Sequence, residues 1–220
     1  MPGYPNPSFS EIEKDINRTF NSGDQTISQE NRDRLRPILT AYIKRNPTVG
    51  YWQSMSYITA ILWTQLSEEH AFWALSLMVE CILQTDYFTR IMTGILIDQK
   101  WYNELFEYYL PEVKQHLDAC WFPSENYIPK WFSCWFANIF QFEVLYKLWD
   151  ILFLQGVISM FKIALAIMSL VKDQILKSED LSEFFEILNN YPKSLTDPYP
   201  LIREMSKFNI THDTIVKLRK

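Results

Sequence analysis

Two short polar segments of this 220-residue chain contain the side chains best suited to chemistry. In the first, Asp15 and Arg18 stand three positions apart, which places them close together on a helix surface. In the second, Gln53 follows the turn 46–50 and would lie in the first turn of a helix. The guanidinium of Arg18 is permanently charged and can stabilise negative charge. The amide of Gln53 can both donate and accept hydrogen bonds. The structural alternative is an exposed ion pair worth only ~0.2–1 kcal/mol, beside an ordinary polar residue.

The hydrophobic pattern predicts that helices position these side chains. Phe9, Ile12 and Ile16 recur at helical spacing and predict a first helix over residues 8–20. Thr26, with Gln29 three positions later, is expected to cap a second helix that ends at Asn46-Pro47. Its apolar face is predicted to consist of Leu35, Ile38, Leu39, Tyr42 and Ile43. Pro37 lies within this second helix and should kink it or mark a later start. Gly50 then precedes a third predicted helix over residues 51–66.

The rest of the chain shows the same helical character. Ser67 begins a new segment, and further helices are predicted over residues 71–83, 98–109, 111–120, 131–142, 144–154, 160–171, 181–190 and 201–208. Gly94 is expected to separate two short helical pieces, and Pro192 to follow the end of its helix. No stretch alternates with period two, and no linker divides the sequence. We therefore predict an all-α fold of roughly ten or more helices in a single domain over residues 1–220.

Composition excludes several classes of protein. The five glycines are scattered, so neither a dinucleotide-binding fingerprint nor a phosphate-binding P-loop is present. The net charge of -5 disfavours a nucleic-acid partner. His116 and Cys120 are four positions apart, but two ligands do not make a zinc site. The longest apolar stretch, 151–171, is interrupted by polar residues and is too broken for a membrane span. Three cysteines without a paired spacing indicate reduced thiols in the cytoplasm.

Taken together, the two polar segments resemble the TBC domain, the Rab GTPase-activating module. The stretch I-x-x-D-x-x-R-T-F is present over residues 12–20, and Y-x-Q over residues 51–53. Other fragments of the family pattern follow in order at residues 39–42, 46–47, 50–51, 71–73, 131–136, 149–150 and 164–167. The resemblance covers about residues 10–175 and implies the same all-α fold that the hydrophobic pattern predicts.

The resemblance implies a GTPase-activating protein that accelerates GTP hydrolysis by a Rab-family small GTPase. In that family an arginine finger and a glutamine finger are supplied in trans, and the matching residues here are Arg18 and Gln53. Asp15 and Tyr51 would support them. The residues that would contact the partner are Trp52, Ser54, Met55, Trp149 and Asp150.

The resemblance also implies that the chain is an activator and not an enzyme in its own right. It would need no cofactor or metal of its own, because GTP and Mg²⁺ belong to the partner GTPase. The implied partner is a GTP-bound Rab, with neither nucleic acid nor direct membrane insertion expected. The location would be cytoplasmic, with transient presence at vesicle surfaces through the Rab. The oligomeric state and the particular Rab are left open.

Departures from the family pattern keep a second function open. Ser54 stands where the family has glycine, Asn21 where it has proline, and Lys147 where arginine often precedes Trp-Asp. The family's N-terminal helix has no counterpart, since the sequence begins 14 residues before Asp15. These departures favour the alternative of a catalytically inactive TBC-fold module that binds a Rab or acts as a scaffold. A helical scaffold unrelated to GTPases would require every fragment of the pattern to be accidental.

Overall fold

The computed structural model describes residues 7–18, 29–83, 86–211 and 214, and the regular elements of these residues are all helical. Eleven α-helices, one π-helix and one 3₁₀-helix occur there, which confirms the predicted all-α fold. Contacts group the chain into two compact units, which we call the N-unit (Met1–Met92) and the C-unit (Thr93–Lys220). The single domain predicted over residues 1–220 stays a prediction.

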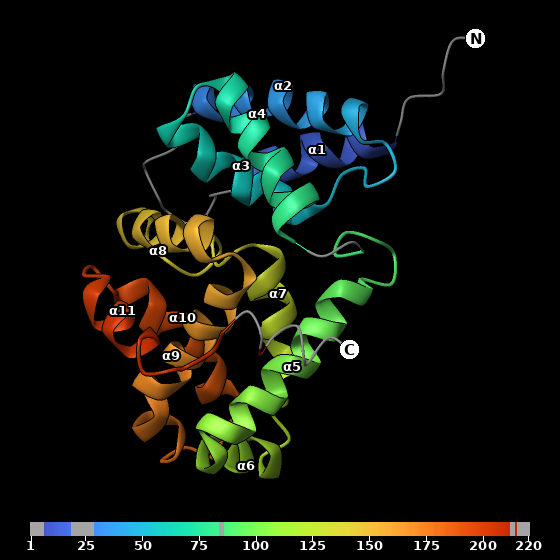
Figure 1. The fold of residues 1–220 in the computed structure, drawn as a ribbon. Helices are drawn as coiled ribbons and strands as arrows, with labels where there is room; N and C mark the ends of the chain where they lie inside the picture. The colour runs from blue at the N-terminus through green and yellow to red at the C-terminus, as the bar shows by residue number, and fades with distance from the viewer. Residues whose placement is uncertain (1–6, 19–28, 84–85, 212–213, 215–220) are drawn as a thin grey trace. The chain divides into compact units, whose positions relative to one another are not determined.

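The N-unit contains α1 (Pro7–Arg18), α2 (Gln29–Arg45), α3 (Gln53–Gln65), α4 (Glu68–Leu77) and the π-helix η1 (Met78–Ile82). The helices α1, α3 and α4 all pack against α2, and α1 also packs against α3 (Figure 1). The five residues of the predicted apolar face of α2 are all buried. That face therefore forms the centre of the N-unit, and Ile12 and Ile16 of α1 are buried beside it.

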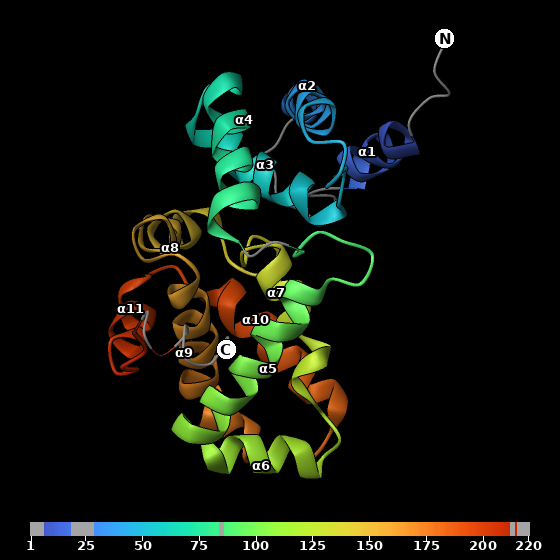
Figure 2. The same cartoon turned by 45° about the vertical axis from the view of Figure 1, so that its right-hand side comes forward.

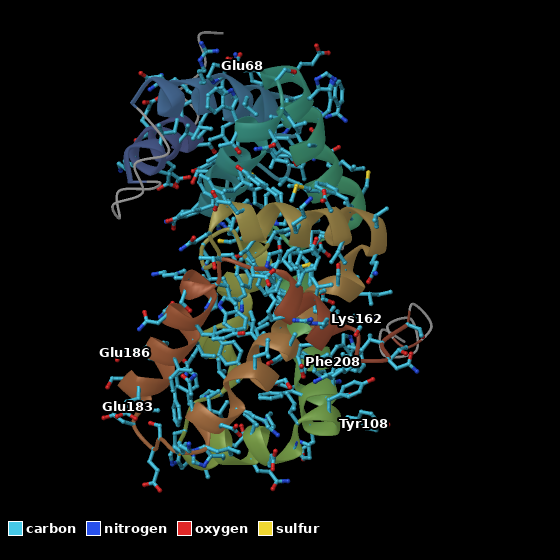
Figure 3. The ribbon with its side chains drawn as sticks, turned by 90° about the vertical axis from the view of Figure 1, so that its left-hand side faces the viewer. Glu68, Tyr108, Lys162, Glu183, Glu186 and Phe208 are labelled. Carbon is cyan, nitrogen blue, oxygen red and sulfur yellow. The ribbon has the colours of Figure 1, made fainter. Side chains whose placement is uncertain are left out.

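The start of α4 follows the sequence prediction. Ser67 is the N-cap, and its Oγ accepts a hydrogen bond from the backbone N–H of His70 at 3.3 Å. Glu68, labelled in Figure 3, lies in the first turn, where a carboxylate favours the positive end of the helix dipole. It also forms an ion pair of 3.6 Å with Arg34 of α2.

The C-unit is built around one long apolar helix, α9 (Val157–Ile175). The other helices are α5 (Thr93–Tyr109), α6 (Pro111–Ala119), the 3₁₀-helix η2 (Ser124–Asn126), α7 (Ile128–Ser133), α8 (Phe142–Gln155), α10 (Leu181–Ser194) and α11 (Tyr199–Met205). α9 packs against α6, α8, α10 and α11, as Figure 2 shows for the last three. Residues 163–168 of α9 are buried without interruption, so this helix is the core of the C-unit. α9 begins at Val157, three residues before the predicted start, and its N-cap residue Gly156 has a φ of 65°.

The predicted helix over residues 131–142 is wrong beyond Ser133. α7 ends there, and turns continue to the start of α8 at Phe142. Trp135 and Phe136 have φ values of 50° and 61°, a left-handed conformation that costs roughly 1–2 kcal/mol per residue. Both rings are fully buried, and burial of a large apolar side chain contributes ~1.5–3 kcal/mol. Burial thus offsets the backbone cost that ends the helix.

Three expectations from glycine and proline are also corrected. Gly94 does not separate two pieces, because it lies in the first turn of α5, which runs unbroken to Tyr109. Pro192 lies inside α10, which continues to Ser194, so the missing N–H affects only the last turn. Pro37 does not mark a late start of α2, which begins at Gln29.

Among the residues that the structure describes, no helix is both long and apolar enough to span a membrane. The outward face of α10 is acidic, with Glu183 and Glu186 exposed to solvent (Figure 3).

Candidate functional site

The first candidate segment ends the helix α1. Ile12 and Ile16 hold one face of α1 in the core, and the Asp15 side chain between them is also buried. Arg18 is the last residue of α1, and its side chain lies outside the described part. The backbone therefore places Arg18 at a helix end whose position is set by the packing of α1 against α2 and α3.

A buried hydrogen bond joins this helix to the second candidate segment. The Tyr51 hydroxyl donates to Asp15 Oδ2 at 2.8 Å, and both residues are less than 10% exposed. A hydrogen bond to a carboxylate is stronger than one between neutral groups, and screening by water is weak where both partners are buried. This bond ties a residue three before Arg18 to a residue two before Gln53. The supporting role of Asp15 and Tyr51 stays a prediction.

The turn before Gln53 is held by its own hydrogen bonds. Asn46 Oδ1 accepts from the Val49 N–H at 3.2 Å, and the Asn46 carbonyl accepts from the Gly50 N–H at 3.0 Å. Gly50 has a φ of 68°, which a residue with a Cβ atom adopts only with strain. Gly50 therefore ends a defined turn, and the chain leaves it in extended conformation at Trp52, where φ is -132°.

Trp52 and Gln53 begin the helix α3. Trp52 is the N-cap residue, and its Nε1 donates to the Val49 carbonyl at 3.1 Å. Its ring lies 6.3 Å from that of Phe88, measured between centroids. Gln53 is the first residue of α3, and its side chain is exposed. The amide of Gln53 is thus presented to solvent from a fixed helix start, where it can contact another molecule.

The structure corrects part of the predicted partner-binding set. Met55 is fully buried in α3, and Trp149 is 4% exposed, with its Nε1 donating to the Trp135 carbonyl at 2.9 Å. Both residues therefore pack inside the protein and do not present a surface to a partner. Ser54 is buried as well, whereas Trp52 is half-buried and Asp150 is exposed, 3.7 Å from Lys147.

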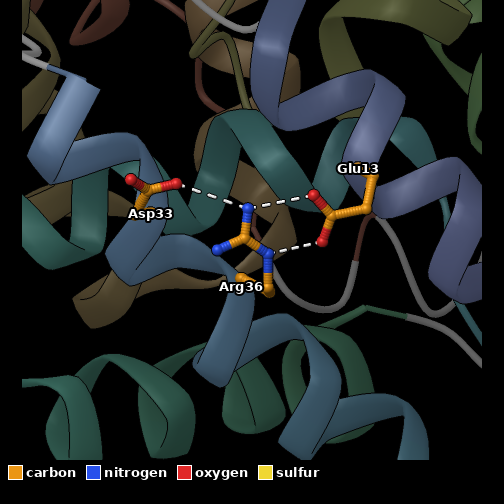
Figure 4. Close-up of polar contacts among 3 residues, drawn as sticks. All are labelled: Glu13, Asp33 and Arg36. Atoms are coloured by element: carbon orange, nitrogen blue, oxygen red, sulfur yellow. Dashed lines mark hydrogen bonds and ion pairs between the residues drawn. The ribbon is translucent and has the colours of Figure 1, made fainter.

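A bidentate ion pair fastens α1 to α2 on the exposed side. Arg36 Nε and Nη2 donate to the two oxygens of Glu13, the second at 2.9 Å, and Nη2 also lies 3.3 Å from Asp33 (Figure 4). The hydrogen bond from Arg36 lowers the pKa of the Glu13 carboxyl below its ordinary value. Glu13 lies five residues before Arg18, so this pair restrains the helix that carries the arginine.

We predict that the Glu13–Arg36 pair stabilises the fold only above acidic pH. Because the folded pKa of Glu13 is lowered, its contribution is present above the ordinary carboxyl pKa and is lost as the pH falls through the folded value. Both side chains are nearly half exposed, so Glu13→Gln should cost only ~0.5–1 kcal/mol at pH 7. Urea unfolding at pH 7 and at strongly acidic pH measures this, with exposed Glu11→Gln as the control. An equal cost at both pH values would contradict the prediction.

We also predict that Tyr51→Phe lowers stability by ~1–3 kcal/mol, because it removes a donor from a buried carboxylate. The matched control is Tyr108→Phe, since Tyr108 is 78% exposed (Figure 3) and its ring contact with Tyr109 needs no hydroxyl. Urea denaturation of the two variants beside the original protein gives the difference. Equal stabilities of the two variants would show that the Asp15 contact contributes nothing.

No group of three metal-ligating side chains gathers in the residues that the structure describes. His116 Nε2 lies 2.7 Å from the Ser178 carbonyl and 4.0 Å from Cys120 Sγ. The histidine thus has a structural partner between α6 and the loop before α10.

Sequence reasoning missed Glu80 and Phe88, which contact the Gln53 segment from η1 and from the loop after it. Glu80 accepts hydrogen bonds from Arg45 and Asn46, both at 3.2 Å. An apolar pattern read as one helix over residues 71–83 does not reveal that Met78–Ile82 is a π-helix. The contacts join residues more than 30 positions apart, for which local spacing carries no signal.

The all-α fold and the order of the two segments are those of a TBC domain. The profile of the Rab-GTPase-TBC domain family matches residues 2–176, and the chain belongs to that family.

Relatives agree with this assignment. TBC1 domain family member 2B of Mus musculus is 30% identical over 199 residues, which cover 90% of this chain and 21% of the relative. Small G protein signaling modulator 3 of Bos taurus is 30% identical over 196 residues, or 88% of this chain and 26% of the relative. This chain therefore spans about a quarter or less of these curated relatives. The crystal structure of the Chlamydomonas flagellar RabGAP TBC domain has a TM-score of 0.84 and 27% identity, covering 92% of this chain and 68% of that one.

Proposed function

We propose that this chain activates GTP hydrolysis by a Rab-family small GTPase, with Arg18 as arginine finger and Gln53 as glutamine finger. The observation that carries the proposal is the buried Tyr51–Asp15 hydrogen bond. It couples the helix that ends at Arg18 to the chain that leads into Gln53. Two groups that must act on one phosphoryl group need such a fixed mutual position, because a misplacement of about 1 Å can cost 10²-fold in rate.

The division of labour follows from the chemistry of the side chains. As the bond from the γ-phosphorus to the leaving oxygen breaks, negative charge develops on the phosphoryl oxygens, and the Arg18 guanidinium stabilises it through forked hydrogen bonds. The Gln53 amide oxygen accepts a hydrogen bond from the attacking water, and its NH₂ group donates to a phosphoryl oxygen. The water is thereby oriented for in-line attack. Mg²⁺ and GTP arrive with the partner, so this chain supplies side chains and not a cofactor.

The partner in this proposal is a GTP-loaded Rab, which the chain meets at a cytoplasmic membrane surface without entering the bilayer. Half-buried Trp52 and exposed Gln53 supply part of the contact from the start of α3. A TBC1 domain family member, a small G protein signaling modulator and a RabGAP TBC domain are among the similar proteins, which supports a small GTPase as the partner class.

The alternative, an inactive Rab-binding module, rested partly on serine in place of the family's glycine. Ser54 is buried on α3, so its side chain offers little surface to a partner. This substitution therefore does not obstruct the approach of a GTPase to Gln53.

Single-turnover GTP hydrolysis by a panel of Rab proteins tests the proposal, with binding of each GTP-loaded Rab measured in parallel. We expect at least one Rab to hydrolyse GTP hundreds of times faster, or more, in the presence of this chain. A Rab that binds tightly in its GTP form without any acceleration would establish the inactive binding module instead.

A further inference from the structure

Glu80 holds the two residues that lead from α2 into the turn before Gln53. Arg45 Nη2 donates to Glu80 Oε2, and Asn46 Nδ2 donates to Glu80 Oε1, each at 3.2 Å. The Glu80 side chain is 24% exposed, and the Arg45 guanidinium also lies over the ring of Trp73, 5.1 Å from its centroid. Both carboxylate oxygens are therefore engaged with the end of α2.

The π-helix η1 places Glu80 where it can make these contacts. The N–H of Leu83 donates to the Met78 carbonyl five residues earlier, at 3.2 Å. This wider turn changes the direction of the side chains relative to a continued α-helix. Met78 and Val79 remain in the core, while Glu80 reaches the end of α2. Such π-turns within helices are rare and occur frequently at functional sites.

The carboxylate of Glu80 also fixes the orientation of the Asn46 amide. An ionised carboxylate only accepts hydrogen bonds, so the NH₂ group of Asn46 must face Glu80. The amide oxygen then faces the other way, where it accepts from the Val49 N–H at 3.2 Å. The Val49 carbonyl in turn accepts from Trp52 Nε1, and Trp52 is the residue before Gln53. A continuous series of hydrogen bonds thus runs from Glu80 through the turn to the start of α3.

We infer that Glu80 is a positioning residue for Gln53, acting through Asn46 and the turn 46–50. This inference rests on the proposed function, in which the Gln53 amide orients the attacking water. Glu80 itself does not touch the reacting atoms. Its role is to keep the Asn46 amide in the orientation that closes the turn, so that α3 begins with Gln53 in a fixed place.

The experiment measures single-turnover GTP hydrolysis by a Rab that the original chain accelerates. The Glu80→Ala variant is added at saturating concentration. We expect the maximal rate to fall by about tenfold to a hundredfold, because a small displacement of an orienting group has that effect. The affinity for the GTP-loaded Rab should stay unchanged. In a Gln53→Ala background, Glu80→Ala should cause no further loss of rate. An equal loss in that background, or weaker Rab binding instead of a slower maximal rate, would overturn the inference.

A reversed donor–acceptor pair provides the rescue. Asn46→Asp keeps an acceptor for Val49 but sets a second carboxylate against Glu80, and we expect it to lower the rate as Glu80→Ala does. Adding Glu80→Gln supplies a donor to the new carboxylate and should restore most of the lost rate. A double variant as slow as Asn46→Asp alone would overturn the inference. This comparison keeps the test decisive where Glu80→Ala does not fold.

Hydrogen exchange separates this inference from the proposed function. Glu80→Ala should speed exchange of the Val49 and Gly50 amides by about tenfold, because the turn loses its support. Unchanged exchange at these amides would overturn the role of Glu80 even if the chain activates a Rab. A chain that accelerates no Rab while these amides respond would overturn the proposed function and with it the positioning of a catalytic group.

Discussion

Arg18→Ala is expected to reduce the stimulated rate of GTP hydrolysis by about 10³–10⁵-fold, the range of an arginine finger. This corresponds to roughly 4–7 kcal/mol of the activation barrier. An exposed ion pair on a helix would contribute only ~0.2–1 kcal/mol. The size of the loss therefore distinguishes a catalytic Arg18 from one that only forms a surface ion pair. The loss should appear in the maximal single-turnover rate. The negative charge that the guanidinium stabilises develops fully on the phosphoryl oxygens only in the transition state.

Two variants sharpen the test at Arg18. Arg18→Lys keeps the charge but not the forked donors, so we expect it to recover only part of the rate. Arg203→Ala removes an exposed arginine of α11 in the C-unit and serves as the matched control, with no expected effect on the rate. If Arg18→Ala and Arg203→Ala behave alike, Arg18 is not the arginine finger.

Gln53→Ala is expected to lower the stimulated rate by about 10²–10³-fold, in the range found when one pre-organised hydrogen-bonding group is removed from an active site. In the proposed mechanism the amide contacts water and a phosphoryl oxygen from the first residue of α3, whose start is held by Trp52 and the turn before it. Because Gln53 is exposed, its truncation should leave the stability of the fold almost unchanged.

The same helix offers a matched control for Gln53. Gln65 is the last residue of α3 and is also exposed, so Gln65→Ala removes an identical amide from the other end. We expect full activity from Gln65→Ala, measured in the same single-turnover assay. Comparable losses from the two substitutions would mean that the amide of Gln53 has no special role.

Helical periodicity was sufficient to predict the faces that form the core. The five apolar residues of α2 and the apolar run of α9 are buried as their spacing predicts, because a face of large side chains has no other stable environment. Periodicity failed at Trp135 and Phe136, where a left-handed turn buries both rings. A run of apolar residues looks the same whether it continues a helix or fills a buried turn.

At the candidate site, local motifs identified single residues but not the contacts between residues that are distant in the sequence. The motifs gave Asp15, Arg18, Tyr51 and Gln53, but the hydrogen bond between Asp15 and Tyr51 joins residues 36 positions apart. Glu80 lies outside the motifs, on a π-helix that the sequence pattern does not distinguish from an α-helix. Met55 and Trp149 were placed on a contact surface because motif membership does not tell an exposed residue from a buried one.

The most direct test of the proposed mechanism uses a Rab whose own water-orienting glutamine is replaced by alanine. If Gln53 supplies this amide in trans, the original chain should still accelerate GTP hydrolysis by that Rab variant, and Gln53→Ala should abolish the acceleration. If the Rab variant is not accelerated while the unaltered Rab is, the partner supplies the amide itself. That result would contradict the assignment of Gln53 as the glutamine finger.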